Sequence, residues 1–262
     1  MNKYFKIYKI FMANSFSYEA QYRGDTWIKM FFNIIWLASM FLTVEVVFRH
    51  TSALAGWDKG EIYLMTLFWI LADELAMMIF GANLPQLPDT ITDGKLDIYL
   101  TKPMSALFAI STKIFLVRSL YRFIMEIIIL AAVIWKFDFA FNLLYVFFSI
   151  LLGLAGIFVL YSFTLMLNTL AFWLHRIDNV NVAISVLTSL GKYPVEVLPR
   201  TMRILAFTAI PIAFTAYIPV AALTGRSSWH GILYALVFAG LFFWGAVKFW
   251  NFALKRYSSA SS

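Results

Sequence analysis

Long apolar stretches alternate with short polar ones along this chain. A membrane-spanning helix needs about 20 consecutive apolar residues, because the hydrocarbon core of a bilayer is about 30 Å thick. Four stretches meet this length, at residues 27–48, 61–83, 141–170 and 232–252. A further stretch begins after Leu107 and ends near Trp135. The pattern therefore predicts five membrane-spanning helices.

Residues 179–226 form an interrupted apolar region that is too long for one span. The region contains Pro194, Pro199, Pro211 and Pro219, and Gly191 precedes the first of them. Proline breaks the helical hydrogen-bond ladder, and freed backbone at membrane depth must be buried in protein or line a cavity. We expect one span followed by a re-entrant hairpin on the outer side, at residues 194–226. This makes six membrane-spanning helices in an all-α integral membrane protein.

The first 24 residues predict an amphipathic helix at the membrane surface. Lys3, Lys6 and Lys9 share one side of a helical wheel, and Tyr4 and Tyr8 lie towards the other. A basic helix with aromatic residues tends to lie in the membrane interface. The alternative is a frayed cytoplasmic tail. Residues 1–256 are expected to form a single transmembrane domain, and residues 257–262 a disordered tail.

Composition supports the membrane interpretation. Of the 262 residues 62% are hydrophobic and only 13% are charged, with a mean hydropathy of +0.78. A soluble domain is about a quarter charged, so the excess apolar surface must face lipid. The net charge of +7 then indicates contact with anionic lipid rather than with nucleic acid. The chain has no cysteine, which excludes disulfides and thiolate metal sites.

Charge asymmetry predicts the orientation. Placing both termini in the cytoplasm puts fourteen of the 21 Lys and Arg residues on that side and leaves seven outside, Lys192 among them. Cytoplasmic loops carry the excess of Lys and Arg in membrane proteins. We therefore expect a multi-pass protein of a prokaryotic cytoplasmic (inner) membrane with both termini inside.

The sequence contains no motif for catalysis, cofactor binding or metal binding. A phosphate-binding loop needs G-x-x-x-x-G-K-[ST], whereas Gly94-Lys95 is followed by Leu96 and Gly191-Lys192 by Tyr193. His50, His175 and His230 lie in three separate loops or span ends and have no metal-ligand spacing. We therefore predict that the chain is not an enzyme, and that ATP and Mg²⁺, if they drive it, bind to a partner subunit.

Two predicted spans carry charges at membrane depth. Asp73 and Glu74 fall near the middle of the second span, and Arg118, Arg122 and Glu126 recur every four residues on the third. Charged side chains inside a membrane usually face the bundle interior and pair. The cluster is either a polar relay for substrate, protons or motion, or a structural ion pair with Arg118 reaching the interface.

The loop at residues 84–108 is the longest polar stretch on the predicted cytoplasmic side. It contains Asp93, Lys95 and Asp97, with Pro88 and Pro103 expected to bound a short helix. Leu96, Tyr99 and Leu100 would then be available to fill a groove of a soluble partner. The alternative is a solvated connector.

A family resemblance favours docking. The segment DGKLDIYLTKP, from Asp93 to Pro103, resembles the D-G-x-L-D-x-x-L-x-[KR]-P cytoplasmic loop of a subfamily of ABC type-2 permeases. The segments LGKYPVEVLP, from Leu190 to Pro199, and IPIAFTAYIP, from Ile210 to Pro219, resemble the G-x-x-P-x-x-x-x-P element and the re-entrant hairpin of that subfamily. The order of these motifs covers nearly the whole chain.

The resemblance implies the permease subunit of an ATP-driven exporter, which pairs with a second permease copy or a related permease and binds separate ATPase subunits. It implies an ATPase-coupling element that comprises Asp93, Gly94, Lys95, Leu96, Asp97, Tyr99, Leu100 and Pro103. Exporters of this family carry lipids, polysaccharides, drugs or peptides. Two other functions fit the residues: a membrane anchor or assembly module, and an ion-coupled transporter that uses Asp73 and Glu74. The lack of an internal repeat counts against the last.

Overall fold

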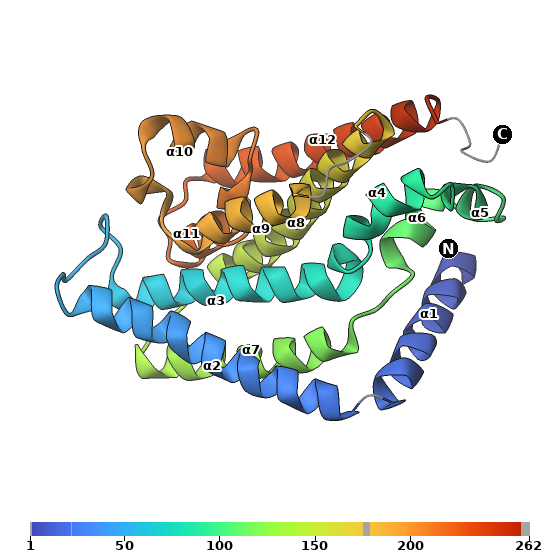
Figure 1. The fold of residues 1–262 in the computed structure, drawn as a ribbon. Coiled ribbons are helices and arrows are strands. Elements are labelled where there is room, and N and C mark those ends of the chain that lie inside the picture. The colour runs from blue at the N-terminus through green and yellow to red at the C-terminus, as the bar shows by residue number, and fades with distance from the viewer. Residues whose placement is uncertain (1, 22, 175–178, 258–262) are drawn as a thin grey trace.

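The computed structural model describes residues 2–21, 23–174 and 179–257, and every named element within these residues is a helix (Figure 1). Within these residues four helices are long and apolar enough to cross a membrane: α2 (Arg23–Phe48), α3 (Lys59–Ala76) with its π-helical continuation η1 (Met77–Gly81), α8 (Leu143–Thr169) with η3 (Leu170–Phe172), and α12 (Trp229–Leu254). Several helices of this length and hydropathy make this a multi-pass membrane protein.

The predicted third span is α7 (Val117–Lys136), a 20-residue helix. Arg118, Arg122, Glu126 and Lys136 lower its hydropathy. It packs against both α3 and α2, and its Arg122 and Glu126 side chains face these helices, whereas Lys136 is exposed. α8 lies at the centre of the molecule and packs against α12, α3 and α11 (Tyr217–Leu223).

The bundle has two distinct ends, which we call the near end and the far end (Figure 1). The near end carries α1 (Asn2–Gln21), the short helices η2 (Leu84–Gln86), α4 (Leu87–Thr92), α5 (Leu96–Leu100) and α6 (Ala106–Thr112), and the last described residue, Tyr257. The far end carries the loops at residues 49–58, 137–142 and 224–228.

Helix α1 lies across the ends of the long helices rather than along them (Figure 1). The Lys3 ammonium donates to the Pro103 carbonyl at 2.5 Å, and the Ser105 amide donates to the Tyr4 hydroxyl at 3.3 Å. Farther along α1, the Ser15 hydroxyl accepts from the Phe115 amide at 3.1 Å. These contacts fix α1 against the segment that surrounds α6. The expected depth of α1 in a membrane interface stays a prediction.

The interrupted region consists of six short helices: α9 (Val180–Ser189), η4 (Leu190–Lys192), η5 (Val195–Val197), α10 (Arg200–Phe207), η6 (Ile212–Phe214) and α11. The combined helix α9–η4 is about 20 Å long, which is too short to cross the hydrocarbon core alone. Segments 200–207 and 212–223 form a pair bent by 66°. The total of six crossings and the re-entrant hairpin therefore stay predictions, as does the disordered tail, since residues 258–262 lie outside the described residues.

Ion pairs and hydrogen bonds hold the far end together. Arg226 donates to both carboxylate oxygens of Glu61, at 2.8 and 2.6 Å, and its guanidinium lies over the Trp57 ring. The Trp57 indole and the Tyr217 hydroxyl both donate to Glu196, at 3.2 and 2.5 Å. Segments 57–61, 196 and 217–226 are thereby tied to one another at this end.

Candidate functional site

The near-end segment at residues 84–112 differs from the single helix expected between Pro88 and Pro103. Two short helices, α4 and α5, are separated by a turn at Asp93–Lys95. Gly94 adopts a φ of 68° in this turn, a conformation that glycine tolerates best. The helix therefore breaks after α4, and α5 is a separate short helix.

The structure corrects which apolar side chains of α5 face outward. Leu96 is 0% exposed and belongs to the core below the near end, so it is not available to a partner groove. Tyr99 is half-buried, and the ammonium groups of Lys102 and Lys113 lie over its ring. The outward apolar side chains are Ile98, at 56% exposure, and Leu100, at 44%. Leu96, Tyr99 and Leu100 are spaced to share one face of a helix. The expectation for Leu96 was wrong because α5 packs with Leu96 against the core, which the spacing alone does not show.

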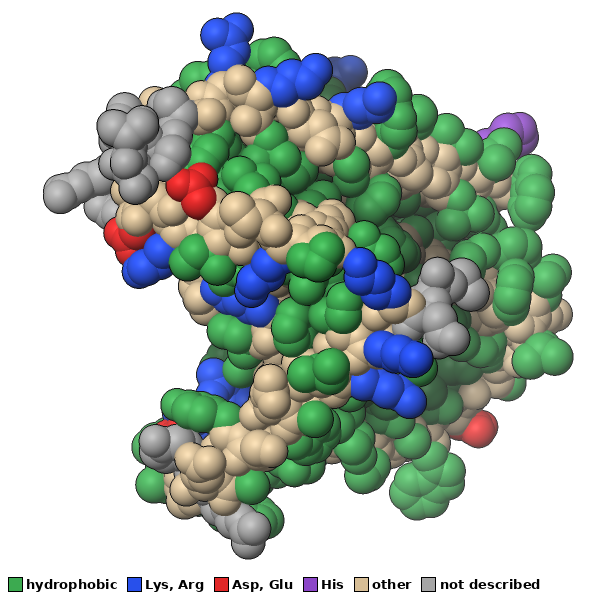
Figure 2. Space-filling view, turned by 90° about the vertical axis from the view of Figure 1, so that its right-hand side faces the viewer, with side chains coloured by type: hydrophobic (Ala, Val, Ile, Leu, Met, Phe, Trp, Pro, Cys, Tyr) green, Lys and Arg blue, Asp and Glu red, His purple; other side chains and the backbone are tan. Residues whose placement is uncertain are grey.

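Lys and Arg dominate the charged side chains on this face (Figure 2). Asp93 and Lys95 form an exposed ion pair at 2.6 Å, and this hydrogen bond raises the pKa of Lys95. Pro103 lies beyond α5 and accepts the hydrogen bond from Lys3 of α1. α5 is therefore framed by basic residues and linked to the surface helix α1.

Asn83 links the end of η1 to the segment before α7, and the sequence analysis did not identify this residue. Its side chain is fully buried and bonds both backbone groups of Ile114: the amide donates to the Ile114 carbonyl at 2.8 Å, and its oxygen accepts from the Ile114 N–H at 2.9 Å. Asn83 follows η1, a π-helix, a form that frequently occurs at functional sites. An asparagine directly after an apolar span was the available signal.

The end of α12 also reaches α5. Burial, and then the neighbouring Asp97 carboxylate, raise the pKa of Tyr257. The Tyr257 ring lies 6.1 Å from that of Phe172, and the Phe172 ring lies 5.7 Å from that of Trp250 on α12. Asp97 therefore faces the carboxyl-terminal part of the chain.

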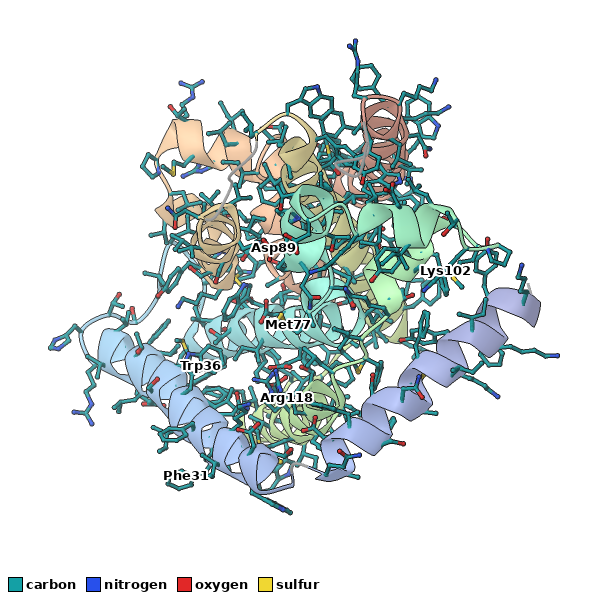
Figure 3. The ribbon with its side chains drawn as sticks, turned by 45° about the vertical axis from the view of Figure 1, so that its right-hand side comes forward. Phe31, Trp36, Met77, Asp89, Lys102 and Arg118 are labelled. Carbon is teal, nitrogen blue, oxygen red and sulfur yellow. The ribbon has the colours of Figure 1, made fainter. Side chains whose placement is uncertain are left out.

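The charges at membrane depth lie between α3 and α7. A guanidinium nitrogen of Arg122 is 3.0 Å from a Glu74 carboxylate oxygen, and the same guanidinium donates to Ser119 at 3.1 Å. Arg118 lies on α7 close to the end of α3 (Figure 3). Asp73 is partly buried on α3 and interacts with Arg122 through its charge.

Glu126 completes the predicted cluster but is held differently. It is 0% exposed, and within the described part of the chain neither of its oxygens has a hydrogen bond of ordinary geometry. Asn33 of α2 is the polar neighbour beside it. No group of three His, Asp or Glu residues in the described ranges is arranged to hold a metal ion.

Three of the prolines predicted for the re-entrant element lie in the breaks between the short helices, whereas Pro219 and Gly191 lie within helices. Pro194 follows η4, Pro199 precedes α10, Pro211 precedes η6, and Pro219 lies in the first turn of α11. A first-turn proline loses no helical hydrogen bond, so Pro219 does not break its helix. Gly191 lies where a side chain would meet Thr215 and the Ile212 carbonyl.

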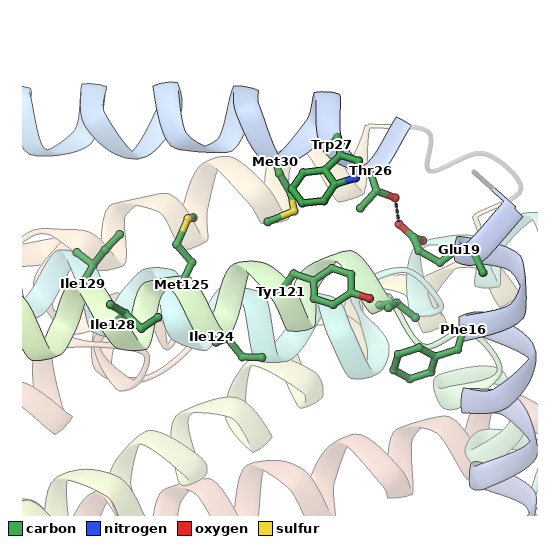
Figure 4. A pocket seen from close by; sticks show the side chains of 12 residues that line it. Phe16, Glu19, Thr26, Trp27, Met30, Tyr121, Ile124, Met125, Ile128 and Ile129 are labelled. Atoms are coloured by element: carbon green, nitrogen blue, oxygen red, sulfur yellow. Dashed lines mark hydrogen bonds between the residues drawn. The ribbon is translucent and has the colours of Figure 1, made fainter. Parts of the chain in front are cut away.

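A groove of about 740 Å³ opens between α1, α2 and α7 (Figure 4). Its walls are almost wholly apolar, and the Thr26–Glu19 hydrogen bond lies at its α1 end. This lining suits hydrocarbon rather than a polar ligand, and it places none of the predicted site residues together.

Comparison with known protein families covers most of the chain. Residues 34–261 match the family model described as ABC-2 family transporter protein. No curated protein and no solved structure matches the chain significantly. Since the family match extends from within α2 to beyond α12, the chain belongs to the ABC-2 transporter family.

Proposed function

We propose that this chain is the permease subunit of an ATP-driven exporter and couples to a separate ATPase subunit through α5. The observation that carries this proposal is the pair of outward apolar side chains, Ile98 and Leu100, on a short helix at the basic near end. Interfaces concentrate binding energy in a few central apolar or aromatic anchors. ATP hydrolysis, with Mg²⁺, takes place in the partner, and this chain receives the resulting motion.

Contacts behind α5 provide a route for that motion into the bundle. Leu96 packs into the core that contains Phe80 of η1 and Trp250 of α12. Asn83 ties the end of η1 to Ile114, three residues before α7. A displacement of α5 is therefore passed to α3, α7 and α12 together. The Glu74–Arg122 pair keeps α3 and α7 moving as one unit.

The near end is proposed to face the cytoplasm, where ATP is available, in the inner membrane of a prokaryote. The far end then faces outward, with segments 200–207 and 212–223 as a re-entrant hairpin. A second copy of this chain, or a related permease, would complete the pathway. The ion-coupled alternative explains neither the exposed pair on α5 nor the family membership.

A co-purification experiment tests the ATPase interface. The double variant I98A/L100A is expected to reduce ATPase association by at least about 2 kcal/mol, the level of an interface hot spot. Lys95→Ala, which removes an exposed charge on the same turn, is the matched control and should change association by less than about 1 kcal/mol. Unchanged ATPase binding by I98A/L100A would remove α5 as the coupling element.

A further inference from the structure

Lys192 lies at membrane depth, not at the outer surface where the charge count placed it. The Trp69 indole donates to the Thr188 carbonyl at 2.8 Å, which fixes the end of α9 beside the middle of α3. Trp69 is about 15 Å from Lys59 at the far end of α3, since each helical residue rises 1.5 Å. The Lys192 ammonium lies 5.7 Å from the centre of the Trp69 ring. The sequence count missed this depth because it assumed that the span ended at the outer surface.

The Lys192 charge has no acidic partner among the residues that the structure describes. Its other neighbours are the Tyr193 ring, with the centroid at 5.2 Å, and the Met40 sulfur of α2 at 3.7 Å. Lysine at membrane depth is costly and normally pairs or faces a water-filled cavity. Among the described residues, the Lys192 charge therefore lies beside two aromatic rings without a carboxylate partner.

The backbone breaks at the same place. The helix α9–η4 ends at Lys192, and Tyr193 and Pro194 are extended. Non-helical backbone at membrane depth is tolerated only where it is buried in protein or lines a water-filled cavity. Tyr193 is exposed, so this break is not wholly covered by the chain itself. The Lys192 charge, the extended backbone and the exposure of Tyr193 all indicate that this surface is in contact with water.

Stabilisation of the α9–η4 carboxyl terminus is the simpler role for this lysine. In that role the ammonium would donate to the last carbonyls of its own helix. Among the described residues its hydrogen-bond partner is instead the Met40 sulfur, on a different helix. The ammonium is thus directed towards α2 and the rings, away from the helix end.

We propose that Lys192, between the faces of Trp69 and Tyr193, binds an oxyanion group (phosphate, sulfate or carboxylate) of the molecule that this permease exports. This inference rests on the proposed transport function. It adds a substrate class, a molecule that carries at least one anionic group.

Cysteine labelling tests the site, because the chain has no native cysteine. Tyr193→Cys, in purified protein in lipid nanodiscs, is treated with sulfonatoethyl or trimethylammonioethyl methanethiosulfonate. Ser52→Cys at the far end is the aqueous control, and Leu241→Cys on the exposed face of α12 is the lipid control. The measured quantity is the labelling rate with the anionic reagent divided by the rate with the cationic reagent. Lys192 should raise this ratio at position 193 about tenfold above its value at Ser52→Cys. Lys192→Gln should abolish this ratio, and Lys192→Arg should keep it.

Protection from labelling tests binding itself. Decyl phosphate and inorganic phosphate are added separately, to distinguish an amphiphilic from a soluble oxyanion, with decyltrimethylammonium as the control of opposite charge. Protection of Tyr193→Cys by either phosphate, lost in Lys192→Gln, supports the site. Labelling as slow as at Leu241→Cys, an unchanged ratio in Lys192→Gln, or protection by neither phosphate would overturn it. None of these outcomes depends on the ATPase, so they are separable from a failure of the α5 interface.

Discussion

Arg122 and Glu126 share one face of α7 but have different surroundings. Arg122 is matched by Glu74 on α3, with side-chain exposures of 23% and 7%. Glu126 is enclosed without a cation of its own at ion-pair distance in the described ranges. A buried, unpaired carboxylate is costly, so this environment favours a neutral side chain at position 126. The pair fits a structural role, and the polar relay stays a proposal.

Removal of Arg122 should therefore destabilise the protein, whereas neutralisation of Glu126 should not. Arg122→Ala leaves the Glu74 carboxylate buried and unpaired, which is expected to cost about 3–5 kcal/mol. Glu126→Gln keeps the shape and removes only a charge, so it should stay within about 1 kcal/mol of the parent. Thermal or denaturant-induced unfolding of the purified variants in detergent measures both changes in stability.

Glu74→Gln in the Arg122→Ala background is the control for this argument. Removing the orphaned charge should recover most of the lost stability, because the cost lies in the unpaired carboxylate. An Arg122→Ala protein as stable as the parent would instead mean that Arg122 reaches the interface and leaves Glu74 independent of it.

At the scale of elements, close backbone contacts position the turn at η6, which begins the second of the two bent segments 200–207 and 212–223. A Cβ added at Gly156 of α8 would lie 2.2 Å from the Phe214 carbonyl oxygen of η6. Gly191 likewise admits Thr215 and the Ile212 carbonyl. Gly156 and Gly191, on different helices, thus both contact the turn at residues 212–215. Gly156 lies about 20 Å along α8 from Leu143. The η6 turn therefore packs against α8 and η4 through contacts that a larger residue at either glycine would obstruct.

Paired glycine substitutions on α8 test this contact. Gly156→Ala must displace η6 and is expected to destabilise the protein by about 1–3 kcal/mol, the usual cost of overpacking. Gly153→Ala is the matched control: nothing lies within 4 Å of its added Cβ, and alanine is favoured over glycine in a helix by about 1 kcal/mol. Equal stability changes in the two variants would show that η6 yields without cost.

Hydropathy predicted the long elements well because their length follows from the bilayer alone. The predicted span at 141–170 corresponds to α8, and that at 232–252 to α12. It could not predict the break between α4 and α5 at Gly94 or the depth of Lys192. Both depend on how short segments pack against distant helices. The π-helix before Asn83 is equally invisible, since nothing in MMIFG distinguishes it from α-helix.

Across the whole molecule, the two ends differ in the kind of contact that holds them. The near end combines a buried asparagine clamp, a surface helix and exposed apolar side chains on α5. The far end is tied by the Arg226–Glu61 and Lys59–Glu45 ion pairs. In the function proposed above, force enters at the near end, where α5 offers a surface, and the ion pairs hold the loops of the far end together.

The orientation of these ends gives the last prediction. Ser52→Cys and Arg203→Cys lie on exposed residues of the far end, and Lys255→Cys on an exposed residue at the near end. Because Lys and Arg accumulate on the cytoplasmic side, an impermeant maleimide should label the first two in intact cells and Lys255→Cys only after permeabilisation. A re-entrant hairpin returns to the side that it left, so Arg203→Cys and Ser52→Cys must behave alike. If residues 180–226 formed two full crossings instead, the chain after α12 would be outside, and Lys255→Cys would be labelled in intact cells together with Ser52→Cys. That result would reject both the six-crossing topology and a cytoplasmic C-terminal segment beside α5.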